Sequence, residues 1–488
     1  EVFCIKDLNL KNHIEFLGYT ILAPEFTEDE CVKKNRTYNA SLKVKFRLTR
    51  YDGKSEKNIV KEIKEQEIYF GQVPLMSENG SFIVNGVFRT IVSQLHKSPG
   101  IFFEVESIAT QVYKKNHFAR IVPNRGMWLD IEIDSKDVCW VKFDKRKKIL
   151  LSTFLLLIDN EKHVTHNEIL NTYYSVINYK KSAYGWTMDY DEKLFKNTRL
   201  SYDLINAETG EVVVPFGKII TARKLKELSD LQVICVKSET LMNGYLAQDI
   251  HYQDTIYPTG TQIDEKLYNI LVENKQNIKL LNIDHERVSS CLRDTIFMDK
   301  IKNYNEALVY FYKVMKPNET YSAEVASNLF QSLFYDDNRF DLSDVGRVRL
   351  NSRLKQYYPE GYESFDLSLN KEDIIAIVKG LLNLKNTNGS SDNIDNLASR
   401  RVRSVGELVM NQCRGSFYKI SKALKERLAN LEADEKVEFY ELFNTKILSS
   451  SLREFFGTSQ LSQMMDNLNP LAKLAHDRRI TVMGKGGV

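Results

Sequence analysis

The sequence lacks any closely spaced pair of cysteines. Its six cysteines occur singly along the chain, at Cys4, Cys31, Cys139, Cys235, Cys291 and Cys413. Zinc sites and disulfide frameworks use cysteines at short fixed spacings, so this distribution argues against both and suits a reducing compartment. His163 and His166 are three residues apart, but no thiol or carboxylate cluster accompanies them. We therefore interpret this histidine pair as part of a polar loop and expect no metal there.

The sequence also lacks a long apolar run and an excess of charge of one sign. The apolar patch at residues 149–158 is much shorter than the roughly 18 residues that a membrane span requires. The 68 basic side chains nearly balance the 65 acidic ones, which leaves a net charge of +3. A polyanionic partner would therefore have to be bound by a local basic surface. From the length of 488 residues we expect two or three domains. The lack of a long apolar run predicts no membrane partner. Because the chain starts at Glu1 rather than Met, we expect it to be a piece of a longer polypeptide.

Convergent carboxylates are scarce as well. Two-metal nucleotidyl transfer requires carboxylates that meet around the cations, and the nearest acidic runs, at residues 189–192 and 336–337, are predicted to be solvated loops. The final residues, 484–488, read GKGGV and resemble the first half of a phosphate-binding loop. The further glycine, lysine and hydroxyl residue of such a loop are not present, so we predict a glycine turn between strands.

The elements that are present mix strands and helices. Residues 39–50 alternate apolar and basic side chains, which predicts a half-buried strand. Asn79-Gly80 and Asn85-Gly86 predict hairpin turns in the following segment. Further strands are predicted at residues 119–122, 129–133 and 139–143, and helices over residues 305–334, with a break at Pro317, and over residues 405–428. The predicted fold class is α+β, with several domains.

Short elements are predicted near the end of the chain. Ser451 and Glu454 form a capping-box pattern that predicts a helix start. Apolar residues at helical spacing predict helix over residues 461–465, and Asn469-Pro470 predicts the start of another helix. Residues 480–483 have the composition of a strand.

Three basic clusters suggest a nucleic-acid partner. They lie at residues 144–148, 400–403 and 478–479, and the second closely follows acidic residues in the segment 392–395, on predicted loops. Arginine binds phosphates in a bidentate manner and also pairs with guanine edges. Any one cluster is typical of a solvated surface, but three clusters in one chain favour nucleic acid.

Long segments then resemble one family. Residues 71–104 read GQVPLMSENGSFIVNGVFRTIVSQLHKSPGIFFE, and four further segments follow in the same order as in that family, at residues 119–134, 339–354, 392–407 and 456–480. They resemble the beta subunit of bacterial-type (bacterial or plastid) DNA-directed RNA polymerase. The resemblance implies an N-terminal fragment with a protrusion domain at residues 1–98 and 395–460, a lobe domain at 99–394, and the start of the fork and rifamycin-pocket region at 461–488.

The resemblance implies a wall along the path of the first RNA nucleotides, which is also the rifamycin pocket. The residues that match it are Val92, Gln460, Gln463, Asp466, His476, Arg479 and Thr481. Neutral hydrogen-bonding groups there would hold an RNA backbone and still let it move. Asp466 is expected to pair with a nearby arginine.

The resemblance also implies a surface for non-template DNA, including a pocket for an unpaired guanine. The matching residues are Lys97, Ile394, Asp395 and Arg400, with Arg403 beside them, and Trp128 as a base-stacking residue. Stacking a base on an aromatic side chain contributes roughly 1–3 kcal/mol. A tryptophan of the core is the alternative for Trp128.

Several positions depart from the family's usual pattern. Lys97 replaces an arginine, which puts bidentate pairing in doubt. Thr481 stands where serine is usual, Asp477 where a basic residue is usual, and Lys485 where proline is usual. Thr481 keeps the hydroxyl but is bulkier, so rifamycin binding is a hypothesis for an inhibition assay.

By resemblance, the chain is part of an enzyme that performs templated nucleotidyl transfer from ribonucleoside triphosphates. No catalytic residue is expected in this segment, and Mg2+ would be held by the beta-prime subunit and not by this segment. The implied partners are beta-prime, two alpha, omega and sigma subunits, both DNA strands and nascent RNA, in bacterial cytoplasm or an organelle stroma. The alternatives are a non-catalytic DNA- or RNA-binding module and a nucleotide-hydrolysing switch built on the glycine-rich end.

Overall fold

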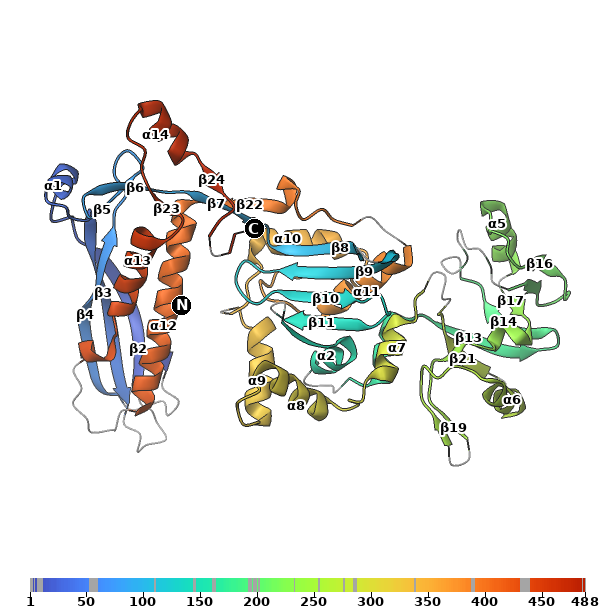
Figure 1. Ribbon diagram of the computed structural model, residues 1–488. Coiled ribbons are helices and arrows are strands. Elements are labelled where there is room, and N and C mark those ends of the chain that lie inside the picture. The colour runs from blue at the N-terminus through green and yellow to red at the C-terminus, as the bar shows by residue number, and fades with distance from the viewer. Residues whose placement is uncertain are drawn as a thin grey trace. The chain divides into compact units, whose positions relative to one another are not determined.

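A computed structural model gives the fold of the chain (Figure 1). It describes residues 3, 5–6, 12–51, 60–108, 111–143, 146–159, 164–191, 195, 200, 202–231, 233–252, 255–274, 277–283, 288–337, 339–387, 391–430, 439–484 and 486–487. Helices and sheets alternate along the described chain, so the predicted α+β class is confirmed. None of the described helices has both the length and the apolar character that a membrane crossing requires.

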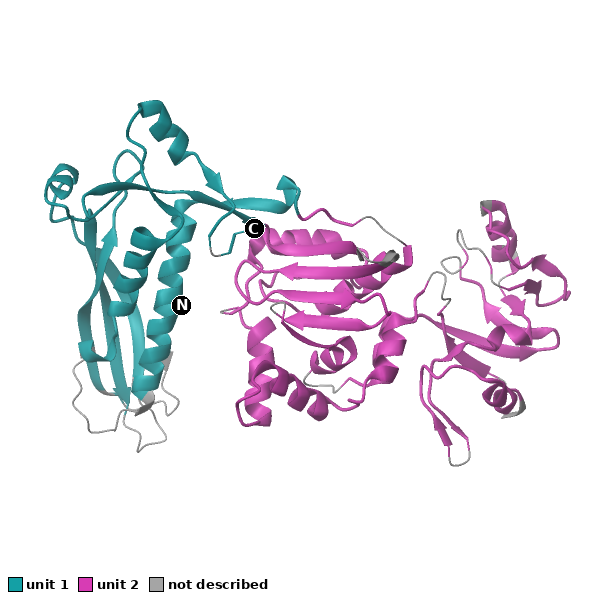
Figure 2. Ribbon diagram, in the orientation of Figure 1, with its two compact units in different colours: residues 1–97, 395–488 teal, residues 98–394 magenta. Residues whose placement is uncertain are grey.

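The chain divides into two compact units (Figure 2). Unit 1 consists of Glu1–Lys97 together with Asp395–Val488, and unit 2 consists of Ser98–Ile394. Unit 1 is therefore built from two segments that are distant in the sequence. The domain names protrusion, lobe and fork stay predictions.

The main sheet of unit 1 is antiparallel, in the order β1-β2-β3-β4. Its strands are β1(Ile5–Lys6), β2(Asn12–Ile21), β3(Asn39–Tyr51) and β4(Val60–Pro74). The strand predicted over residues 39–50 is confirmed, and its alternate residues Val44, Phe46 and Leu48 are buried. They belong to the same core as the apolar face of α12(Val405–Asn430), which lies along the sheet (Figure 1). The long helix predicted over residues 405–428 is confirmed.

Two small sheets complete unit 1. One has the order β23-β6-β5 and the other β22-β7-β24. Their strands are β5(Phe82–Val84), β6(Val87–Ile91), β7(Ser93–Lys97), β22(Arg400–Arg403), β23(Ser462–Met464) and β24(Ile480–Thr481). Asn85 and Gly86 have φ values of 51° and 79°, so the predicted hairpin turn between β5 and β6 is confirmed. β22 corrects our expectation of a loop at residues 400–403, because this segment pairs along its length with β7.

Two predictions near the end of the chain are wrong. Helix α13(Lys446–Thr458) already begins before Ser451, so Ser451 is not a helix cap. The buried face formed by Leu448, Leu452, Phe455 and Phe456 runs through that position and extends the helix. Residues 461–465 contain strand β23 rather than a helix, because Ser462–Met464 pairs with β6.

The remaining helices of unit 1 are short. They are α1(Glu28–Lys33), α14(Pro470–Asp477) and the 3-10 turns η2(Leu397–Ser399) and η3(Phe439–Leu442). The predicted helix start at Asn469-Pro470 is confirmed, because the Asn469 side chain accepts a hydrogen bond from Leu471 N at 2.9 Å. The strand predicted over residues 480–483 is limited to Ile480–Thr481.

Unit 2 contains a five-stranded antiparallel sheet covered by helices (Figure 1). Its strands are β8(Gly100–Ile108), β9(Gln111–Val122), β10(Leu129–Ile133), β11(Cys139–Phe143) and β12(Lys147–Leu150). Its helices are α2(Leu151–Leu157), α3(His166–Tyr173), α7(Cys291–Met298), α8(Tyr304–Met315), α9(Ala323–Phe334), α10(Ser343–Leu354) and α11(Lys371–Thr387). The predicted strands at residues 119–143 are confirmed, and so is the pair of helices over residues 305–334 with its break around Pro317.

A second sheet of unit 2 has seven strands in the order β16-β15-β17-β14-β13-β21-β18. Its strands are β13(Val176–Ser182), β14(Gly185–Asp189), β15(Leu204–Asn206), β16(Val212–Val214), β17(Val233–Val236), β18(Tyr245–Leu246) and β21(Asn277–Leu281). Helices α5(Ala222–Leu231) and α6(Glu265–Asn274), the turn η1(Ser238–Leu241) and the hairpin β19(Ile250–Tyr252)–β20(Thr255–Tyr257) accompany it. This sheet has its own apolar core around Trp186, Ile234 and Val236.

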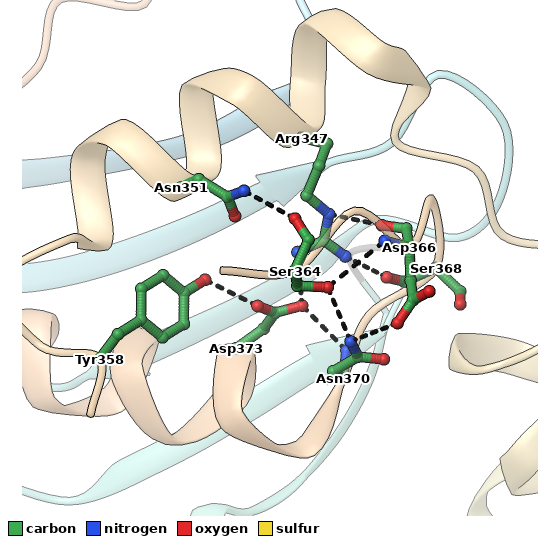
Figure 3. Close-up of polar contacts among 8 residues, drawn as sticks. All are labelled: Arg347, Asn351, Tyr358, Ser364, Asp366, Ser368, Asn370 and Asp373. Atoms are coloured by element: carbon green, nitrogen blue, oxygen red, sulfur yellow. Dashed lines mark hydrogen bonds and ion pairs between the residues drawn. The ribbon is translucent and has the colours of Figure 1, made fainter. Parts of the chain in front are cut away.

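A buried ion pair connects α10 to α11 in unit 2 (Figure 3). Arg347 Nη1 donates to Asp373 Oδ2 at 2.8 Å, and the exposed fractions of the two side chains are only 4% and 0%. Tyr358 Oη donates to the other carboxylate oxygen of Asp373 at 2.6 Å. Arg347 also donates to the carbonyl oxygens of Asp366 and Ser368, so the loop between the helices is bound to the same guanidinium. Because its hydrogen-bonding groups are paired, this buried network holds the two helices and their loop together.

Candidate nucleic-acid interface

The candidate RNA wall of unit 1 is built on the pairing of β6 with β23. Gln463 lies directly opposite Thr90 in this ladder. The pairing continues beyond β6, because Val92 N donates to Leu461 O at 2.9 Å. Gln460 is exposed beside this strand, whereas the Val92 side chain is fully buried. Val92 therefore contributes to the core beneath the wall in unit 1.

His476 connects the end of α14 to β23. Its Nδ1 accepts a hydrogen bond from Asp466 N at 3.4 Å, and its Nε2 lies 3.0 Å from Gln463 Oε1. A ring nitrogen that accepts from a backbone N–H carries no proton, so Nε2 carries the proton and donates it to Gln463. The imidazole ring thus fixes the orientation of the Gln463 amide and leaves the Gln463 NH2 group as a donor.

Asp466 makes a different contact from the one predicted. Its carboxylate accepts a hydrogen bond from Leu468 N at 3.2 Å. Within the described residues no arginine forms an ion pair with Asp466, so the expected arginine pairing is not found in that part of the chain. In the turn that follows β23, the Asp466 carboxylate thus accepts a hydrogen bond from a backbone N–H of the same turn.

Arg479 and Thr481 lie on the segment that leads from α14 into β24. Arg479 is exposed, and its backbone N donates to His476 O at 3.1 Å. Thr481 lies opposite Gln94 in the parallel pairing of β24 with β7. Its hydroxyl accepts from Met483 N at 3.2 Å, and Gln94 Nε2 donates to Met483 O at 3.0 Å. Gln94, a fully buried residue that the sequence did not indicate, therefore anchors the end of the wall.

The glycine-rich end folds as a tight turn in the part that the structure describes. Gly484 and Gly486 have φ values of 96° and 82°, a backbone conformation that side chains with a Cβ rarely adopt. A Cβ on Gly487 would lie 2.2 Å from Val482 O, so this position requires glycine. Lys485 and Val488 lie outside the described residues.

The candidate DNA surface of unit 1 is built on the other edge of β7. Arg400 lies opposite Lys97 in the antiparallel pairing of β22 with β7. Its guanidinium donates to Asp395 Oδ1 at 2.6 Å. Arg403 Nε lies 3.6 Å from Glu407 Oε1, and Arg401 also donates to the Glu407 carboxylate. Lys97, Asp395 and Arg400 are therefore brought together. Arg403 lies with Arg401 and Glu407 on the opposite face of β22, because side chains alternate along a strand, and Glu407 is an acidic partner that sequence reasoning missed.

His96 lies within this basic cluster, at a position that sequence reasoning did not indicate. Its side chain is buried, and it lies opposite Arg401 in the β7–β22 ladder. Burial, together with the charges of Arg403 and Arg401, lowers the pKa of His96 from 6.5 to about 3. The ring is therefore neutral at neutral pH and adds no charge to the surface.

Ile394 and Trp128 belong to unit 2, where they lie in one small apolar cluster. The cluster consists of Phe102, Val122 and Ile394, with the half-buried Trp128 packed against them. Ile394 is buried, so it supports the indole ring rather than presenting a surface of its own. Trp128 is half-buried and packs against this cluster.

In the basic cluster at residues 144–148, Lys147 and Lys148 make internal contacts. Lys147 Nζ donates to Met315 O at 2.6 Å, and Lys148 Nζ lies 4.3 Å from the centre of the Trp140 ring. Residues 144–145 lie outside the described residues. Among the described residues there is also no group of three or more histidine, cysteine and acidic side chains with the geometry of a metal site.

Known proteins are similar to this chain along its whole length. A family model described as RNA polymerase Rpb2, domain 2 matches residues 275–403. The chain is 42% identical over 496 aligned residues to the DNA-directed RNA polymerase subunit beta of Agrobacterium fabrum, with 100% of this chain and 35% of the relative covered. For the subunits of the same name from Caulobacter vibrioides and Rhizobium leguminosarum the identities are 40% and 41%, with 36% and 35% of the relative and all of this chain covered.

These matches place the chain in the class of large subunits of multisubunit RNA polymerases. Within that class it belongs to the family of DNA-directed RNA polymerase beta subunits, as the resemblance of residues 71–104 and the later segments predicted. The chain spans about a third of the length of the curated relatives that it matches.

Proposed function

We propose that this chain forms part of the beta subunit of a transcribing RNA polymerase, where it binds downstream DNA and nascent RNA. The observation that carries the proposal is the 40–42% identity to named beta subunits over the complete length of the chain. The reaction of the assembled enzyme is templated transfer of a nucleotide from a ribonucleoside triphosphate to RNA. The proposal places Mg2+ on the beta-prime subunit and assigns no metal ligand to this segment.

The RNA contact is assigned to the wall formed by Gln463, His476, Arg479 and Thr481. Three of these residues offer amide, imidazole and hydroxyl groups, which can hydrogen-bond to an RNA backbone. Contacts of this kind position a transcript without fixing its sequence. The exposed Arg479 supplies the one positive charge among them, which favours phosphate.

The DNA contact is assigned to two surfaces that are supported independently. In unit 1, Lys97 and Arg400 face each other across β7 and β22, and Asp395 orients Arg400 through their 2.6 Å hydrogen bond. In unit 2, Trp128 offers a partly exposed ring for base stacking. Lys97 carries a compact charge, so it would neutralise a phosphate but could not form the bidentate guanine contact of an arginine.

The test is reconstitution of the full-length beta subunit with beta-prime, alpha, omega and sigma subunits. We expect a complex that incorporates ribonucleotides on a DNA template. In this complex, Arg479→Ala should raise the KM of a short RNA primer about tenfold, with a smaller effect on extension of long transcripts, because the lost contact serves the first nucleotides. Arg453→Ala, at an exposed position of α13, is the matched control and should change the KM less than about twofold.

The alternative, a non-catalytic nucleic-acid-binding module, makes the opposite prediction. Such a protein would bind DNA or RNA with the same affinity whether or not beta-prime is present, and it would not co-purify with alpha subunits. Inhibition by rifamycin is a further readout of the same wall, since the drug and the RNA would share Gln463 and His476. Full activity of the assembled enzyme at saturating rifamycin would exclude a functional rifamycin pocket.

A further inference from the structure

Helix α14 carries His476 of the candidate RNA wall, but the helix is not held in place by an apolar face. Of its residues only His476 is buried. Leu471 and Leu474, the apolar pair on one side of the helix, are 72% and 47% exposed. Short helices in proteins are normally stabilised by packing such a face against a core. Something else must therefore hold α14 in position.

Polar contacts at the last turn of α14 hold the helix in position. His476 binds Gln463, as described above, and the next residue, Asp477, accepts a hydrogen bond from Thr90 Oγ1 at 2.7 Å. Thr90 and Gln463 are direct partners in the β6–β23 ladder. Two consecutive helix residues are therefore bound to the two members of one cross-strand pair. This arrangement fixes both the position of the helix end and its rotation about the helix axis.

The hydrogen bond from Thr90 to Asp477 is expected to be strong, for two reasons. The Thr90 side chain is buried, with 3% of its surface exposed, so its hydroxyl depends on a protein partner. A hydrogen bond to an ionised carboxylate is stronger than one between neutral groups. Removing the carboxylate would leave the buried hydroxyl without this acceptor, and removing the hydroxyl would free the helix end on this side.

The contact also determines where Arg479 lies. Arg479 follows Asp477 by two residues and precedes Ile480, which is paired with Ser93 in the β24–β7 ladder. The short stretch that carries Arg479 is thus fixed at one end by the Thr90 hydrogen bond and at the other by a sheet. A shift of the helix end would move both His476 and Arg479.

We propose that Thr90 and Asp477 are positioning residues for the candidate RNA wall, and that their hydrogen bond orients His476 and Arg479 toward the transcript. The inference rests on the proposed function of that wall. It assigns a role to Asp477, at a position where the resembling family usually has a basic residue, and to Thr90, which the sequence did not indicate. A basic side chain at position 477 could not accept the Thr90 proton, so the contact is particular to chains with this pair of residues.

The test uses the assembled polymerase and measures extension of a short RNA primer. Thr90→Val and Asp477→Ala should each raise the KM of the primer about fivefold, because the wall is displaced, while elongation of long transcripts changes less than about twofold. The double variant should be no worse than the worse single variant, since both remove the same bond. Thr90→Ser keeps the hydroxyl and should restore the wild-type KM. Glu454→Ala removes a charge at an exposed position of α13 and is the control for Asp477→Ala.

The outcomes separate the two levels of the proposal. If Thr90→Val and Asp477→Ala leave the primer KM unchanged while Arg479→Ala raises it, the positioning role is refuted and the RNA wall stands. If none of the three changes the KM, the RNA wall itself is refuted. A loss of thermal stability or assembly without a change in KM would also overturn the proposal, because it would show a purely structural bond. Should Asp477→Ala fail to assemble, the comparison of Thr90→Val with Thr90→Ser decides.

Discussion

The chain holds helices in place in two different ways, and the α10–α11 pair of unit 2 and α14 of unit 1 show the contrast. Arg347 and Asp373 connect α10 and α11 within a core that already buries Leu350, Leu354 and Ile377. Helix α14 has no such core, and its contacts to β6 and β23 come from His476 and Asp477.

The difference indicates what each region is built to do. A helix that is held by burial has one arrangement and a large free-energy cost for leaving it. A helix that is held by a few polar contacts keeps its outer face exposed to solvent, as Leu471 and Leu474 show. Substitution of a single side chain can shift such a helix. We expect regions that contact a moving ligand such as RNA to be of the second kind.

The largest effect on stability should come from breaking the buried Arg347–Asp373 ion pair in unit 2. Arg347→Met leaves the Asp373 carboxylate buried without its cation, which should lower the free energy of unfolding by about 3–5 kcal/mol. Chemical denaturation combined with hydrogen exchange of the α10 and α11 amides would measure it. Arg223→Met, at a side chain that is 92% exposed, is the matched control and should change stability by less than about 0.5 kcal/mol. The double variant Arg347→Met, Asp373→Leu should be more stable than Arg347→Met alone, and an equal or lower stability would contradict this account.

A smaller effect on stability should come from protonation of His96, the buried histidine of the β7–β22 ladder, as the pH falls. The pKa of His96 is lowered from 6.5 to about 3, so between these pH values the unfolded chain binds a proton that the folded chain does not. Stability is therefore fully present above pH 6.5 and is lost as the pH falls toward 3. At pH 5 the loss from this group should reach up to about 2 kcal/mol.

The comparison variant for this prediction is His96→Leu, which has no titrating group. Its unfolding free energy relative to the wild type should rise between pH 7 and pH 5, whatever packing difference the substitution causes at pH 7. A difference that stays constant over this range would show that His96 titrates normally in the folded chain.

The smallest effect should come from the outer face of α14. Leu471→Gln and Leu474→Gln replace apolar side chains that are 72% and 47% exposed, so stability should change by less than about 0.5 kcal/mol. The same change at Leu424, which is fully buried on α12, is the positive control and should destabilise unit 1 strongly. A marked loss of stability from Leu471→Gln would mean that this face is covered and that the comparison between the two helices fails.

The elements that sequence reasoning found are those with a strong local signal. The alternation in β3, the long apolar stripe of α12 and the Asn469 cap of α14 are all decided within a few neighbouring residues. The errors occur where distant pairing decides. Residues 461–465 have helical spacing, but Ser462 pairs with β6, and the Arg89–Ser462 contact spans 373 positions.

The candidate site shows the same limit. Individual residues such as Gln463, His476 and Arg479 were named from the family resemblance, but the bonds among them were not. The partner of Asp477 is 387 positions away in the sequence, at Thr90, and no local pattern indicates it. The burial that lowers the pKa of His96 depends on β22 in the same way.

The position of β7 between β22 and β24 has a consequence for the assembled enzyme. Neighbouring strands of a sheet are about 4.8 Å apart, so the two flanking strands are held roughly 10 Å from each other by backbone hydrogen bonds alone. In the proposed function, β22 belongs to the DNA surface and β24 to the RNA wall, and the five residues of β7 act as a fixed spacer between them. Side-chain changes on either edge would alter what each surface binds, whereas the distance between the two polymers would stay the same.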